Sequence, residues 1–253
     1  IRKSLTGGDV SDFDMQLGLS LPADNASSKI TIDRFDAELD IVGTEFAWLA
    51  GQPPLQDVGA HVSLHDNVVT IDVQQGAHDR LALQSSTLYI NPALQHADQT
   101  RLLTLKLKGE APAEEIVQIL GAPQINQLEN IPIDISDLSG DVRASVHLTG
   151  SLANRKAKFQ LVSADATLTQ GALSNIFREF DVSDADLVLA LRPGRVDISG
   201  AAKVDEVAGD FSLSLADNRL RLSGQMSPHA RLAELAATFA GQEITGEIGG
   251  RFA

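Results

Sequence analysis

The sequence contains no cysteine, few aromatic residues and no long apolar run. The absence of cysteine excludes a disulfide framework and a thiolate metal site. An aromatic content of 4% is low for a face that binds sugars or single-stranded nucleic acid. No stretch reaches the roughly 18 apolar residues that a membrane-spanning helix needs, and no signal-peptide pattern opens the chain. Because the first residues, "IRKSLTGGDV", lack an initiator Met, we expect a fragment whose anchoring segment lies outside it.

Positive charge is also scarce. Lys and Arg total 20 against 34 Asp and Glu, which gives a formal net charge of -14, and the acidic residues are spread along the chain. This field repels polyphosphates, so we expect no nucleic-acid partner. The sequence has no G-x-S-x-G elbow, no Walker loop and no dinucleotide fingerprint. We therefore expect a protein that is not an enzyme and uses no cofactor.

What the sequence does contain is sustained alternation of apolar and polar residues. The stretch Val58–Val73 alternates on both sides of "HDN", which is typical of a β-hairpin. In "DFSLSLADNRLRLSGQM" the apolar positions on either side of "ADN" are expected to pair. Half-apolar strands of this kind indicate an antiparallel sheet with one apolar face and one wet face. The predicted fold class is therefore mainly β, an elongated antiparallel sheet with a few short helices.

Four short segments break the alternation and are predicted to be helical. In Ser227–Gly241, a Ser N-cap precedes Pro at the first helical position, and an apolar stripe follows. The other three are Ala111–Leu120, Thr44–Gly51 and Gly171–Phe180.

The same order of segments occurs twice. The strands, hairpins and short helices of the first half match those of the second with an offset of about 127 residues, although few residues are identical. We predict two β-groove repeats, residues 1–125 and residues 126–253. Stacked units of this kind are typical of elongated proteins.

Carboxylate pairs are the strongest candidates for catalytic chemistry. Asp184 with Asp186, or Asp134 with Asp137, could supply the acid and base of a glycan hydrolase built on a β-solenoid. Both pairs flank predicted turns in an evenly acidic chain, so we interpret them as solvated charges that discourage aggregation of sheet edges.

Two histidines have the spacing of a helical metal site. His61 and His65 are four residues apart, but on a strand this spacing separates them by roughly 13 Å. We therefore predict no metal site.

The alternating apolar faces are the remaining candidate site, and patterning leaves two arrangements open. The faces could pack against each other in a closed sandwich or barrel. Alternatively, with few helices available as cover, they could line a groove for hydrocarbon chains. The groove candidates are Leu17, Leu19, Val62, Leu64, Val69, Ile71, Leu103, Leu105, Leu107, Val146, Leu148, Phe159, Leu187, Leu189, Val196, Ile198, Phe211, Leu213, Leu215, Leu220 and Leu222.

One region carries a family resemblance. The run Glu45–Ile90 resembles the periplasmic repeat of the AsmA-like proteins, most closely those of the YhdP type. The shared features are an aromatic residue near "PPL", a hairpin, a Gly after its return strand and a third apolar strand. Here they are Trp48, Pro53–Leu55, Val58–Val73, Gly76 and Leu81–Ile90. The second repeat keeps the hairpin and its Gly but lacks "PPL".

The resemblance implies a bridge-like lipid-transfer protein of the cell envelope. Such proteins are anchored in the inner membrane and extend a β-sheet, curled into a taco-like groove, across the periplasm towards the outer membrane. Phospholipid acyl chains would lie in the groove and be carried between the two membranes. An alternative for the same family is a scaffold for assembly of outer-membrane proteins, acting through sheet edges. A β-solenoid enzyme acting on envelope polysaccharide is a further alternative.

Overall fold

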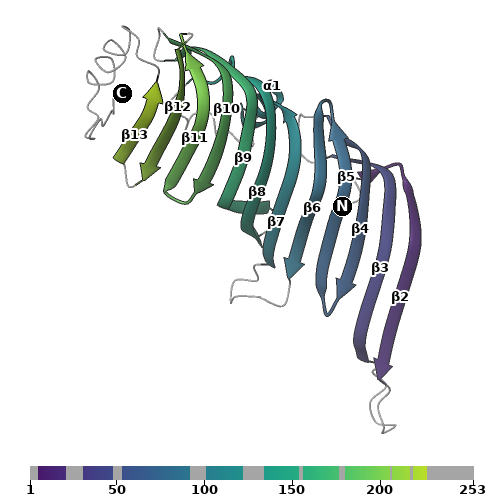
Figure 1. Ribbon diagram of the computed structural model, residues 1–253. Helices are drawn as coiled ribbons and strands as arrows, with labels where there is room; N and C mark the ends of the chain where they lie inside the picture. Colours follow the sequence, from purple (N-terminus) through teal and green to yellow (C-terminus); the bar gives the residue numbers. More distant parts are fainter. Residues whose placement is uncertain are drawn as a thin grey trace. The chain divides into compact units, whose positions relative to one another are not determined.

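The computed structural model is almost entirely β-strand (Figure 1). It describes residues 5–20, 31–47, 53–91, 101–121, 134–153, 156–176, 180–205, 207–216 and 219–226. The elements are β1 (Leu5–Thr6), β2 (Asp9–Ser20), β3 (Thr31–Phe46), β4 (Leu55–His65), β5 (Val68–His78), β6 (Leu81–Asn91), β7 (Arg101–Pro112), α1 (Ala113–Gly121), β8 (Ser139–Ala153), β9 (Lys156–Ile176), β10 (Phe180–Arg192), β11 (Arg195–Val204), β12 (Val207–Ala216) and β13 (Arg219–Met226).

The strands form one antiparallel sheet of 13 strands, which confirms the predicted fold class. Sheet order follows chain order from β3 to β13, while β1 and β2 both pair with β3. The chain divides into two compact units. The first comprises residues 1–109 and 146–161, and the second comprises residues 110–145 and 162–253.

In the first unit, a two-residue turn sets the register of the β4–β5 hairpin. Asp66 and Asn67 both have positive φ, at 49° and 65°, as a type I′ turn requires. The flanking pairs are His65 with Val68 and Leu64 with Val69. The hairpin predicted over Val58–Val73 is therefore confirmed.

In the second unit, β10 to β13 form consecutive hairpins with the pairing that the alternation predicts. The turn between β10 and β11 contains Gly194 at φ 71°. In the last hairpin, Leu213 lies opposite Leu222 and Leu215 lies opposite Leu220. Each of these apolar residues therefore meets another apolar residue across the ladder.

Backbone irregularities recur at matching places in the two units. Positive φ angles occur in pairs of residues that are 126 or 127 positions apart: Gly43 and Gln170, Asp57 and Asp184, Asn67 and Gly194, and Asp79 and Asp205. Bulges and turns at equivalent positions are what an internal duplication would produce. The boundary between residues 125 and 126 stays a prediction.

The helix predictions had mixed outcomes. Helix α1 confirms the prediction over Ala111–Leu120; it follows Pro112, which cannot continue a ladder, and has acidic residues in its first turn. The predicted helix Gly171–Phe180 is wrong, because β9 continues to Ile176 and β10 begins at Phe180. Buried Leu173 pairs with Val182, so ladder pairing overrides the weak helical pattern there.

The remaining two helix predictions are tested only in part. In the predicted helix Thr44–Gly51, residues 44–46 instead belong to β3, where Thr44 is buried and pairs with Val58. Ser227–Gly241 lies outside the described residues. Within the part of the chain that the structure describes, no helix is both long and apolar enough to span a bilayer.

Few apolar side chains are buried in either unit. Those in the first unit lie on β4, β6 and β7, and those in the second lie on β7, α1 and β9 to β11. They are Leu55, Val58, Ala60, Leu81, Leu103, Ala111, Ala113, Val117, Leu173, Ala185 and Ala202. No large side chain among the described residues is fully buried. The described residues of either unit therefore do not form the central core of a two-layer domain.

Gly200 on β11 provides a test of the sheet geometry. Its φ is 150°, and a Cβ at this position would collide with the carbonyl oxygen of Asp186 on β10. We expect Gly200→Ala to lower the free energy of unfolding by roughly 3 kcal/mol, measured by urea denaturation. Gly59→Ala is the matched control, because its Cβ would meet only the flexible side chain of Gln75, 3.3 Å away. Equal stability of the two variants would contradict the described β10–β11 packing.

Candidate functional site: two apolar sheet faces

The second unit carries an apolar face that extends over five strands. Directly opposed residues of an antiparallel ladder point to the same side of the sheet, so the register fixes which side chains share a face. Leu187 lies opposite Leu168, Leu189 lies opposite Ile198, and Ile198 lies opposite Leu213. The complete face, here called the unit-2 apolar face, consists of Ala164, Ala166, Leu168, Leu187, Leu189, Leu191, Val196, Ile198, Phe211, Leu213, Leu215, Leu220 and Leu222.

Side chains of the unit-2 apolar face are partly exposed. From β9 to β12 every one is neither buried nor fully exposed, whereas Ala185, at the bulge on β10, is only 1% exposed. Neighbouring aliphatic side chains cover each other's flanks, but no second layer of described residues buries them. The opposite side of the same strands is largely polar, with Asp197, Ser212 and Ser214. The alternation therefore produces an accessible apolar surface on one side of the sheet and a polar, solvent-exposed surface on the other.

The first unit carries an equivalent surface on β2 to β6. Leu17 lies opposite Phe35, Leu64 lies opposite Val69, and Val62 lies opposite Ile71. We call this the unit-1 apolar face: Met15, Leu17, Phe35, Ala37, Leu39, Ile41, Ala60, Val62, Leu64, Val69, Ile71, Val73, Leu88 and Ile90. Of this face, the sequence-based candidates include only Leu17, Val62, Leu64, Val69 and Ile71, although the same alternation could have identified the other nine residues.

Exposure differs between the edge and the interior of the first unit. Leu17 and Leu19 on β2 are 48% and 52% exposed, because no described strand flanks β2 on its outer side. Leu19 follows a register shift and lies opposite Ile32.

The remaining candidates are distributed over β7, β8, β9 and β13. Leu105 and Leu107 on β7 are partly exposed and alternate with lysines, while Leu103 is buried. Val146 and Leu148 on β8 are partly exposed. Phe159, Leu220 and Leu222 lie on described strands, but their side chains are outside the described set.

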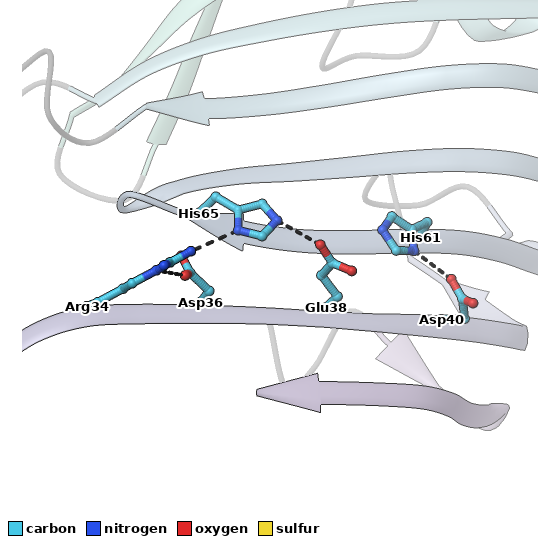
Figure 2. Close-up of polar contacts among 6 residues, drawn as sticks. All are labelled: Arg34, Asp36, Glu38, Asp40, His61 and His65. Carbon is cyan, nitrogen blue, oxygen red and sulfur yellow. Dashed lines mark hydrogen bonds and ion pairs between the residues drawn. The ribbon is translucent and has the colours of Figure 1, made fainter. Parts of the chain in front are cut away.

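The polar side of the first unit contains a cluster that the sequence analysis did not identify (Figure 2). His65 on β4 reaches two carboxylates of β3: its Nε2 lies 2.8 Å from Glu38 Oε1 and its Nδ1 lies 3.4 Å from Asp36 Oδ1. Arg34 donates to the other oxygen of Asp36, whose side chain is buried. Hydrogen bonds to Glu38 and then Asp36 raise the pKa of His65. Burial opposes ionisation of Asp36, but hydrogen bonds from Arg34 and His65 outweigh it and lower the pKa of that carboxyl.

His61 lies four residues before His65 on β4, on the same side of the sheet. Its Nδ1 lies 2.7 Å from Asp40 Oδ1 on β3, and Asp72 of β5 lies opposite His61 on the other side. Thr87 donates to Asp72 at 2.8 Å. The two histidines thus bind separate carboxylates, and the absence of a metal site stays a prediction. Among the described residues, no group of three or more potential ligands could hold a metal.

Three of the four carboxylates named as catalytic candidates form local contacts. Lys203 Nζ lies 2.5 Å from Asp184, while Asp186 accepts a hydrogen bond from the backbone N–H of Gln170 at 3.0 Å. Asp134 accepts from the backbone N–H of Ser136, which lowers its pKa and fixes a turn before β8. Each of these three carboxylates has a local structural partner.

The His65 cluster predicts a pH dependence of stability. Because the folded pKa of His65 lies above its usual value near 6.5, its contribution is fully present below that pH and is lost as pH rises through the folded pKa. We expect an NMR titration to show the raised pKa, and Glu38→Gln to lower it. Asp72→Asn, on the far side of His61, serves as the control and should leave it unchanged. A His65 pKa at or below 6.5 in the wild-type chain would contradict the geometry.

Comparison with known proteins assigns neither a family nor a function to the chain. No protein-family model, no curated protein and no solved structure matches the chain. The function must therefore be inferred from the two apolar faces, each of which extends over five strands.

Proposed function

We propose that the chain is a non-enzymatic segment of a lipid conduit and that its apolar faces bind the acyl chains of phospholipids. The observation that supports this is the combination of register and exposure. Aliphatic side chains line one face of each unit over several strands, yet nearly all of them remain partly exposed. Monomeric soluble proteins rarely leave apolar surface of this extent uncovered unless something binds to it.

The size of the face suits a hydrocarbon chain. Strands are spaced about 4.8 Å apart, so an acyl chain about 20 Å long crosses roughly four of them. The unit-2 apolar face extends over β9 to β13 and can therefore accommodate one chain across its strands. Each methylene removed from water contributes about 0.8 kcal/mol wherever it lies. A face of similar aliphatic residues offers similar affinity along its length and so allows the lipid to slide.

The cellular setting of the proposal rests on the AsmA-like resemblance. It would put the chain in the periplasm, as part of a protein anchored in the inner membrane by a segment outside this sequence. Phospholipid would then move between the inner and outer membranes while its headgroup stayed in water.

A scaffold for outer-membrane proteins is a second candidate, and one observation favours it. Strand β2 exposes both its faces and one backbone edge, with Phe13 60% exposed. Such an edge could add a strand from a partner protein. Crosslinks from β2 to an outer-membrane protein in cells would favour this role over the conduit.

A charge placed on the apolar face tests lipid binding. We expect Leu213→Asp to reduce co-purifying phospholipid about 50-fold. The introduced charge would prevent burial of about three methylenes of the lipid tail, which lowers the binding free energy by about 2.4 kcal/mol. Ser212→Asp is the matched control, since it adds the same charge to the other face of β12, where Ser212 is exposed. The measurement is native mass spectrometry after detergent-free purification, with circular dichroism to verify folding. A folded wild-type chain without lipid, or equal lipid in both variants, would contradict the proposal.

Tail length and headgroup should affect affinity very differently. Shortening each tail by two methylenes should weaken binding roughly 15-fold per tail, because about 1.6 kcal/mol of burial is lost. Exchanging the headgroup should change affinity by less than about threefold, since the face offers no polar anchor. The measurement is calorimetry with short-chain phospholipids below their micelle concentration. Strong headgroup selectivity at constant tail length would indicate a specific pocket instead.

A further inference from the structure

The β4–β5 hairpin of the first unit and the β10–β11 hairpin of the second carry the same kind of cross-strand pair beside their turns. In the first unit, Nε2 of His65 lies 2.8 Å from Oε1 of Glu38 on β3. In the second, Nη2 of Arg192 lies 2.7 Å from Oδ1 of Asp165 on β9. The basic residue is in each case the last residue of its strand before the turn. We call these two contacts the turn-end pairs.

The turn-end pairs occupy equivalent positions in the two units. Their acidic residues are 127 positions apart in the chain, and so are their basic residues. The same spacing relates Asn67 and Gly194, the residues of positive φ in the two turns. In both units the carboxylate lies opposite the residue two positions before the basic one, which is Ser63 in the first unit and Ala190 in the second. The two pairs therefore span the same diagonal of the ladder.

The second histidine pair of the first unit has no such counterpart. His61, which contacts Asp40, lies four residues further from the turn. The positions 127 residues later are Val188 and Thr167, which lie opposite each other and cannot form an ion pair. Only the pair beside the turn is thus present in both units, which indicates a role specific to that end of the ladder.

Each turn-end pair flanks the outermost row of an apolar face. The last described pair of the β3–β4 ladder at this end is Ala37 with Leu64, and that of the β9–β10 ladder is Ala164 with Leu191. Ends of ladders open locally more often than their centres. A cross-strand ion pair beside the last row opposes this opening and so helps to keep the row in register.

The basic residues of the two pairs differ in one chemical respect. The guanidinium of Arg192 keeps its charge at every pH that the folded chain would meet. Protonated His65 can donate from both ring nitrogens, from Nε2 to Glu38 and from Nδ1 to Asp36. The neutral ring has a single N–H, so loss of the proton removes one of the two hydrogen bonds together with the charge attraction.

The surroundings of His65 favour its protonated form. On β5 the residue opposite it is uncharged Val68. Hydrogen bonds to Glu38 and then Asp36 raise the pKa of His65 above its usual value near 6.5. Carboxylates outnumber basic groups on the strands around it and in the adjoining turn. The charged and titratable groups there are Asp14 on β2, Arg34, Asp36, Glu38 and Asp40 on β3, His61 on β4, Asp66 in the turn and Asp72 on β5.

We propose that the turn-end pair holds the last row of each apolar face in register, and that its histidine makes this contact pH-sensitive in the first unit but not in the second. When pH rises and His65 loses its proton, the β3–β4 ladder opens more often at its turn end. The β9–β10 ladder keeps its arginine contact over the same range. This device concerns the pairing of strands and does not depend on what the apolar faces bind.

Amide hydrogen exchange of the full chain between about pH 6 and about pH 8.5 tests the difference between the units. Each exchange rate is divided by the intrinsic rate at the same pH. Protection at residues 36–38 and 63–65 should fall about threefold as pH rises, which is the size of effect expected for an exposed ion pair. Protection at residues 163–165 and 190–192 should stay constant. The same pH response in both units, or none in the first, would overturn the proposal.

Exchanging the basic residues tests which side chain is responsible. His65→Arg should keep the protection of the first unit and remove its pH response, whereas Arg192→His should introduce a response in the second. His61→Gln is the matched control, because it removes a histidine–carboxylate contact from the same two strands and should leave the response at the turn end. A response that persists in His65→Arg, is lost in His61→Gln or fails to arise in Arg192→His would overturn the proposal. None of these readouts requires lipid, so this proposal and the lipid conduit can fail separately.

Discussion

The register of the antiparallel ladder is the constraint on which every other feature depends. Because side chains alternate with period 2, a slip of one residue would move a whole row of leucines to the polar side. Short turns with left-handed residues hold the register, at Asp66 and Asn67 in one unit and at Gly194 in the other. The apolar faces and the histidine cluster both follow from the same pairing, since each consists of residues brought together across strands.

This constraint gives the sheet two chemically different sides, and the described strands do not enclose an ordinary core. Among the residues that the structure describes, few apolar side chains are buried, and most aliphatic side chains on the two faces are covered only in part. The stability of such a sheet comes from cross-strand pairs and backbone ladders, which contribute modestly per pair but recur along every strand. A hydrocarbon ligand would bury the same side chains that a second protein layer buries in a sandwich. Binding and folding would then depend on one surface.

The sequence was most informative where structure is local. Alternation predicted the strands and the hairpins, because each strand carries its own period. It failed at residues 171–176, where β9 continues past Gln170, a residue of positive φ that interrupts the period. The histidine cluster was missed for a different reason: His61 and Asp40 are 21 residues apart and meet only once β3 and β4 are in register. The alternation within a strand does not predict which residue of another strand it will lie opposite.

A face of nearly uniform aliphatic residues binds by area, and this limits what it can select. Its affinity rises with the length of hydrocarbon that it covers, but it cannot distinguish one headgroup from another or fix an end point. Selectivity and direction must then come from residues outside the two apolar faces, so the capacity to hold lipid and the control of its movement are set by separate residues.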